Sequence, residues 1–152
     1  MFKRWILKNT DMNDINKYVF VISSEITTDG EKSNIELTTT GSFSLVNGRW
    51  VLLYDEISED KTTVTKTIIK ADKSSVTITR KGESSSKLIM TEGERNLCHY
   101  RTQYGDILMG VYCNEVVNEL NENGGIISLS YTLDVNAAVL SDNKVTIRVR
   151  EV

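Results

Sequence analysis

From Ser33 to Ser141, short runs of β-branched and aromatic residues alternate with turn signals about every ten residues, and the chain of 152 residues contains no proline. Uninterrupted alternation of this kind is typical of an antiparallel meander. A long meander in a chain of this size must either close on itself or leave unpaired edges that promote aggregation. The pattern therefore predicts an all-β fold, a single antiparallel up-and-down β-barrel of about eight to ten strands.

The turn signals divide the meander into ten candidate strands, of which one or two neighbours are expected to merge. Asp29-Gly30 and Asn47-Gly48 are strong signals for tight hairpin turns. Gly41 interrupts an otherwise regular strand and predicts a bend or a bulge there. The segment 118–125 is expected to be the most polar loop. The candidate strands cover residues 17–27, 33–46, 49–57, 62–70, 75–81, 86–92, 95–103, 106–117, 126–135 and 144–152.

The composition, with 39% hydrophobic and 26% charged residues, fits one globular domain. We assign residues 16–152 to the barrel domain and residues 1–15 to an N-terminal extension. Phe2, Trp5 and Ile6 have helical spacing among basic residues, which favours a short helix or an arm packed over one mouth of the barrel. The alternative for this extension is an amphipathic segment that binds a membrane surface.

Several classes of protein are disfavoured by the sequence. The net charge of −3 argues against a nucleic-acid partner, because such proteins usually carry a basic excess. No apolar run approaches the ~20 residues of a membrane span, and no secretory leader is recognisable at the start. We therefore expect a cytoplasmic protein in which Cys98 and Cys113 are reduced thiols.

No catalytic motif stands out, and no cofactor is implied. His99, the only histidine, follows Cys98 directly, and neighbouring residues of a strand point to opposite faces. The two side chains are therefore not expected to form a metal site or a nucleophile pair. Gly48 and Trp50 match the Gly-X-Trp of lipocalins, but here Gly48 is expected to be a turn residue and Trp50 a packing residue.

Polar side chains on several strands share a side with apolar neighbours, which predicts that they point into the barrel. Tyr54 and Glu56 follow Trp50 and Leu52 in this way, and Arg80 follows Val76 and Ile78. Two interpretations are open: a structural network within the core, or a cluster that orients a ligand in a pocket. The candidate ligand-binding residues are Tyr54, Glu56, Arg80, Tyr100, Thr102 and Tyr131.

These residues also carry a family resemblance. Tyr54-Asp55-Glu56, Lys70, Arg80-Lys81-Gly82, the segment from Tyr100 to Gly105, and Leu129-Ser130-Tyr131 occur in an order that resembles the YwiB-like family of small bacterial proteins of uncharacterised function. The resemblance covers roughly residues 17–152 and implies a calycin, or lipocalin-like, barrel. It brings no established activity, so it implies no catalytic residues.

The leading functional hypothesis is that the barrel binds a small molecule or a peptide inside or at its mouth. The alternative is a non-catalytic interaction or structural protein whose interior is filled by its own side chains and whose exterior carries an apolar patch or a homodimer contact. An enzyme that uses Glu56 as acid or base is the least favoured hypothesis. An interior cavity of ~300 Å³ or more would discriminate between the first two.

Overall fold

The computed structural model describes residues 18–152, which contain ten β-strands and no helix. The helix or arm expected within residues 1–15 lies outside the described residues. The strands are β1 Tyr18–Thr28, β2 Glu31–Val46, β3 Arg49–Ile57, β4 Val64–Ala71, β5 Ser75–Lys81, β6 Ser85–Thr91, β7 Arg95–Thr102, β8 Gly105–Asn121, β9 Gly124–Val135 and β10 Ala138–Glu151.

All neighbouring strands are antiparallel, and together they form a closed barrel whose strand order follows the sequence. Closure joins the first and last strands, with β1–β10 pairs running from Tyr18↔Glu151 to Thr27↔Asp142. The predicted meander and its closure are confirmed. The expected merging of neighbouring strands is wrong, because every candidate strand remains a separate element bounded by its own turn.

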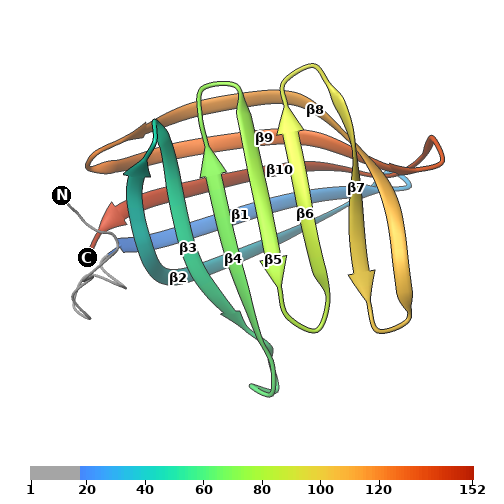
Figure 1. The fold of residues 1–152 in the computed structure, drawn as a ribbon, viewed down its shortest axis with the longest axis horizontal. Helices are drawn as coiled ribbons and strands as arrows, with labels where there is room; N and C mark the ends of the chain where they lie inside the picture. The colour runs from blue at the N-terminus through green and yellow to red at the C-terminus, as the bar shows by residue number, and fades with distance from the viewer. Residues whose placement is uncertain (1–17) are drawn as a thin grey trace.

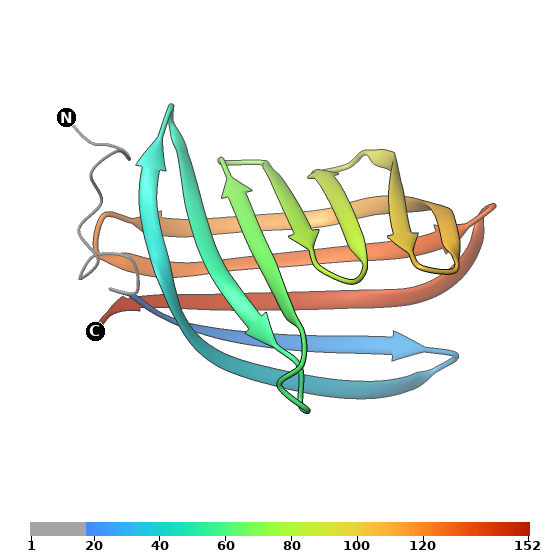
Figure 2. The same cartoon turned by 60° about the horizontal axis from the view of Figure 1, so that its bottom comes forward.

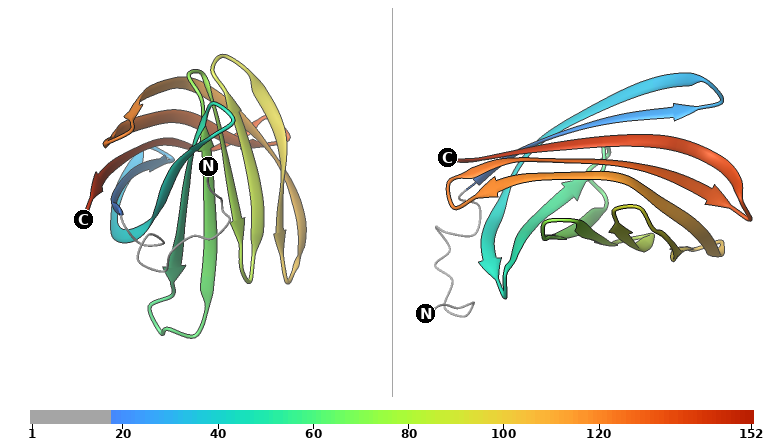
Figure 3. Two further views of the ribbon diagram at one scale, coloured as in Figure 1. Left: turned by 60° about the vertical axis from the view of Figure 1, so that its left-hand side comes forward. Right: turned by 90° about the horizontal axis from the view of Figure 1, so that it is seen from above.

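The short strands β3–β7 cross the direction of the long strands β1, β9 and β10 (Figure 1). In the right-hand view of Figure 3, the short green strands form a layer in the lower part of the picture, and the long orange and red strands β9 and β10 form the layer above it. Two long strands connect the two sets: the first part of β2 pairs with β1 and its end with β3, while β8 pairs first with β7 and then with β9. This near-orthogonal arrangement leaves an interior enclosed between two layers of strands.

Gly41 is the point at which β2 changes partners, since it pairs with Tyr18 on one side and Tyr54 on the other. Figure 2 shows that β2 curves strongly along its length. A Cβ atom at Gly41 would lie 2.8 Å from Cε2 of Phe20 and closer still to the carbonyl oxygen of Leu53. The predicted bend is confirmed, although neither ladder of β2 contains a bulge.

Two boundaries differ from the sequence prediction. The segment 118–125 is mostly strand, because β8 continues to Asn121 and β9 begins at Gly124. The last strand begins at Ala138, well before residue 144, after a tight turn in which Asn136 and Ala137 have φ of 52° and 68°. The β8–β9 and β9–β10 hairpins pair beyond the residues in which hydrophobic and polar side chains alternate. The polar residues of 118–125 therefore lie mostly in strands and not in a loop.

One end of the interior is packed with apolar and aromatic side chains. Phe43 stacks on Trp50 at 4.8 Å between ring centroids, and Tyr18 contacts Phe43 edge-on at 5.2 Å. Phe20 and Leu52 are fully buried in the same core. The prediction that Trp50 is a packing residue is confirmed, as is the turn role of Gly48, which has φ of +80°.

The seam between β6 and β7 is the weakest part of the ring. These strands pair only at Ser85↔Arg101 and Ser86↔Tyr100. Farther along the seam, side chains replace the ladder: the Asn96 amide donates to the Ile89 carbonyl at 3.1 Å, and the Ile89 N–H lies 3.5 Å from the Cys98 sulfur. We refer to this region as the β6–β7 seam.

Candidate functional site

The register of the sheet brings the predicted polar residues together on the inner face. Tyr54 of β3 pairs with Thr67, Thr67 with Arg80, Arg80 with Ser86, and Ser86 with Tyr100. Five neighbouring strands therefore present one row of polar side chains to the interior. This row lies just beyond the packed end of the barrel.

Glu56 lies on the same face of β3 as Tyr54 and pairs with Thr65 of β4. Its carboxylate is 4.0 Å from the Arg80 guanidinium and accepts a long 3.5 Å hydrogen bond from the Thr67 hydroxyl. The side chain of Glu56 is 33% exposed and that of Arg80 is 46% exposed. Glu56 and Arg80 therefore lie within reach of each other, as expected of polar side chains that share the inner face, but the pair is only partly buried and loosely held because the space beside it is open.

Two tyrosines border this ion pair, and burial changes the acidity of both. Burial, followed by the negative charge of Glu56, raises the pKa of Tyr54 to about 12, although Arg80 and Thr67 oppose the rise. Burial also raises the pKa of Tyr131, again against the effect of Arg80. Both phenols are thus neutral hydrogen-bonding groups at physiological pH.

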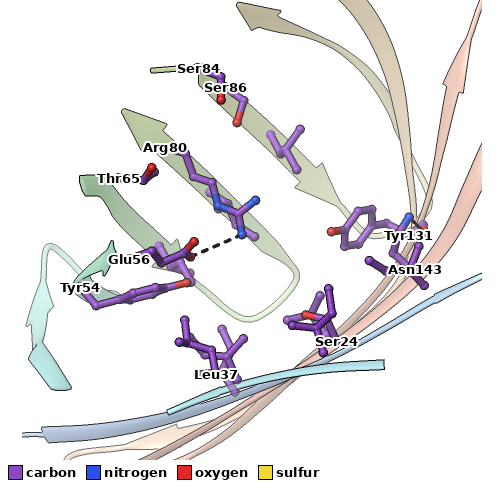
Figure 4. Close-up of a pocket in the computed structure, with 18 of the residues that line it drawn as sticks. Ser24, Leu37, Tyr54, Glu56, Thr65, Arg80, Ser84, Ser86, Tyr131 and Asn143 are labelled. Carbon is purple, nitrogen blue, oxygen red and sulfur yellow. Dashed lines mark hydrogen bonds and ion pairs between the residues drawn. The ribbon is translucent and has the colours of Figure 1, made fainter. Parts of the chain in front are cut away.

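The facing wall belongs to the long strands. Tyr131 of β9 pairs with Asn143 of β10, which pairs with Ile26 of β1. The Asn143 amide donates to the Ser141 hydroxyl at 3.0 Å, and Asn143 is buried. Figure 4 shows Tyr54, Glu56 and Arg80 pointing toward one another, with Tyr131 and Asn143 across the interior.

These walls enclose a cavity of about 420 Å³ at the end of the barrel opposite the packed aromatic cluster. Its walls combine aliphatic side chains with the polar groups just described. The lining residues are Ile22, Ser24, Ile26, Ile35, Leu37, Tyr54, Glu56, Thr65, Ile69, Ile78, Arg80, Ser84, Ser86, Leu88, Tyr100, Tyr131, Asn143, Val145 and Ile147.

Of the six predicted site residues, five line this cavity and Thr102 does not. The Thr102 hydroxyl instead donates to the Gly105 carbonyl at 3.1 Å and accepts from the Tyr104 N–H. Thr102 is the last residue of β7, so its side chain closes the turn that follows. Strand alternation placed it on the correct face but did not show that the strand ends there.

The two cysteines and the histidine do not share a site. Cys98 and Cys113 are both free and buried, whereas His99 points outward into solvent. Among residues 18–152, no group of three His, Cys, Asp or Glu side chains is arranged to hold a metal ion. No helix in this part of the chain is long and apolar enough to cross a membrane.

The family described as "Domain of unknown function (DUF1934)" matches residues 21–147. The chain belongs to the DUF1934 family. The matched region spans all six predicted site residues and the whole cavity lining, so the cavity lies within the family domain.

Relatives of this DUF1934 protein support the same fold. The "Uncharacterized beta-barrel protein YwiB" of Bacillus subtilis (strain 168) is 26% identical over 114 residues, covering 75% of this chain and 79% of YwiB. The crystal structure of the ywiB protein from Bacillus subtilis superposes with a TM-score of 0.80 at 22% identity, covering 92% of this chain and 96% of that one. The resemblance to the YwiB-like family is confirmed; the wider likeness to calycins stays a prediction.

Some cavity residues of this DUF1934 barrel escaped the sequence analysis. Ser24 shares a face with Phe20 and Ile22, so alternation alone could have found it. Ser84 precedes β6 in a turn, where alternation carries no information, and its hydroxyl lies 3.4 Å from that of Tyr100. Asn143 lies in the part of β10 that was not recognised as strand.

Proposed function

We propose that this DUF1934 protein binds a small amphipathic molecule inside the open end of its barrel. The observation that carries the proposal is the cavity of about 420 Å³ between Arg80 on one wall and Tyr131 on the other. Small-molecule sites are usually cavities of roughly 300–1,000 Å³ with apolar walls and a few convergent polar groups. The volume also exceeds the ~300 Å³ that we expect of a barrel that binds a small molecule, which supports the proposal.

The arrangement of side chains sets the chemistry of the ligand. Ile69, Ile78 and Ile147 offer an apolar surface at the base of the cavity. Arg80 and Glu56 retain free hydrogen-bonding capacity because a single 4.0 Å contact joins them. We expect the apolar part of the ligand to face the packed end of the barrel and its polar group to face this ion pair.

An anionic amphipathic fluorophore, 1-anilinonaphthalene-8-sulfonate, is a suitable probe for the cavity. Ser24→Phe places an aromatic ring in the cavity, whereas Ser23→Phe on the same strand is a matched control, because the Ser23 hydroxyl faces Glu36 at 3.3 Å. We expect fluorophore binding to weaken about tenfold or more with Ser24→Phe and to be unchanged with Ser23→Phe.

Native mass spectrometry of the protein purified from its own host provides the second readout. We expect an adduct of small-molecule mass that is lost in Ser24→Phe and kept in Ser23→Phe. Equal fluorophore binding by both variants, together with protein of unmodified mass alone, would contradict the proposal. We also propose the cytoplasm as the location, which the free thiols of Cys98 and Cys113 support.

A further inference from the structure

A second concave site lies on the outer face of the barrel, across β5, β6 and β7 from the interior cavity. It is a groove of about 450 Å³ lined by Thr79, Arg80, Lys81, Gly82, Ser85, Ser86, Lys87, His99 and Arg101. Strand alternation directs Arg80 and Ser86 inward, so the cations that face the groove are Lys81, Lys87 and Arg101. We call this surface the cationic groove.

The register explains how the charges come together. Lys66 pairs with Lys81, Lys81 with Ser85, and Ser85 with Arg101, which places their side chains in one row. Lys87 lies in the next row, paired with Thr79. Like charges directly opposite each other destabilise a sheet, so the Lys66↔Lys81 pair lowers the stability of the barrel. This local excess of positive charge stands out in a protein whose net charge is −3.

Local carboxylates leave most of this charge unneutralised. Lys81 and Lys87 form no ion pair with any residue in the described range 18–152. Arg101 is held by Asp106 at 3.7 Å, and both side chains are more than half exposed. Within residues 18–152, the groove thus has two ammonium groups without an ion-pair partner beside the Arg101 guanidinium, whose carboxylate partner is weakly bound.

We propose that the cationic groove binds a phosphorylated small molecule through its phosphate or diphosphate group. Lysine ammonium groups and the arginine fork are the usual protein donors to phosphate oxygens, and the Thr79 and Ser85 hydroxyls add neutral donors. Asp55 and Asp106 stand at the two ends of the row, paired with Lys66 and Arg101. An extended polyanion would meet these carboxylates, whereas a compact anion fits between them.

Calorimetric titration with inorganic pyrophosphate at constant ionic strength tests this site. We expect Lys87→Gln to weaken binding about fivefold and the double variant Lys81→Gln/Lys87→Gln to weaken it well over tenfold. Asp106→Asn should strengthen binding, because it frees the Arg101 guanidinium. Lys144→Gln, at an exposed position of β10, is the matched control and should leave binding unchanged.

The proposal is overturned if pyrophosphate does not bind, or if Lys87→Gln and Lys144→Gln weaken binding equally, since binding would then reflect overall charge alone. Tighter, Lys87-dependent binding of a polyglutamate peptide would also overturn it by identifying an acidic protein as the partner. Ser24→Phe should bind pyrophosphate like the wild type, because the cavity is a separate site. The two proposals can therefore fail independently.

Discussion

Tyr54 links the cavity to the stability of the whole barrel, and its raised pKa gives a measurable consequence. The folded protein holds the phenolic proton up to about pH 12, whereas the unfolded chain loses it near the ordinary value of 10.0. The stabilisation is therefore complete below pH 10.0 and is lost as the pH rises toward the folded pKa. Because Tyr54 is 6% exposed, solvent screening is small.

The size of the effect follows from the shift. About two pKa units at roughly 1.4 kcal/mol each make the loss roughly 3 kcal/mol between the two pKa values. Urea unfolding measured at steps from pH 8 to pH 11.5 reports the free energy of unfolding at each pH. We expect Tyr54→Phe to have a shallower decline above pH 10 than the wild type.

Tyr104→Phe is the matched control, because Tyr104 is 91% exposed. Its alkaline decline should parallel that of the wild type. Absorbance at 295 nm gives an independent measurement, since tyrosinate absorbs there: the fraction of phenols that ionises last should decrease in Tyr54→Phe. Parallel declines in wild type and Tyr54→Phe would refute the inference that Tyr54 is desolvated beside Glu56.

Three further predictions concern stability. Gly41→Ala should cost about 1–3 kcal/mol of unfolding free energy, because the new methyl group meets the backbone of β3; an unchanged urea midpoint would contradict this. Glu56→Gln and Arg80→Met should show a coupling energy below about 1 kcal/mol in a double-mutant cycle, since both side chains are partly exposed, and a larger coupling would mean a tighter pair. The hydrogen bond from Arg95 keeps the pKa of Asp134 below its ordinary 3.8, so its stabilisation is present above that value and lost as the pH falls through the folded pKa. Asp134→Asn should therefore reduce the loss of unfolding free energy as the pH falls below 3.8. An unchanged loss would count against a stabilising Arg95–Asp134 pair.

Alternation and turn chemistry were enough to predict the closed meander. The turn at Asn47-Gly48 was predictable because it depends on local backbone geometry. The bend at Gly41 was predictable because a glycine inside a strand marks a place where the strand bends or another part of the chain comes close. The extension of β8 to Asn121 was not, since pairing with β9 stabilises residues whose own propensity for strand is low. The turn at Asn136-Ala137 lacks the usual glycine and gave no clear signal.

The candidate site was partly predictable for a related reason. Alternation shows which face a side chain occupies, and this identified Tyr54, Glu56 and Arg80 as inward-facing. It does not show how full the interior is, so it could not show that Glu56 and Arg80 stay partly exposed. The cationic groove depends on which strands lie opposite one another in register, and that information appears only when the ladders are known.

The β6–β7 seam makes this ring unequal in its resistance to opening. Separating β1 from β10 would break a ladder that runs from Tyr18 to Thr27, whereas parting the middle of the seam breaks the contacts of Asn96 and Cys98 with Ile89. Amide protons of β6 and β7 that point into the seam should therefore exchange with solvent faster than those that point toward β5 and β8, while the rest of the barrel stays folded. The closed barrel therefore has one weakly paired boundary, and this boundary lies between two strands that follow each other directly in the chain, not where the first and last strands meet.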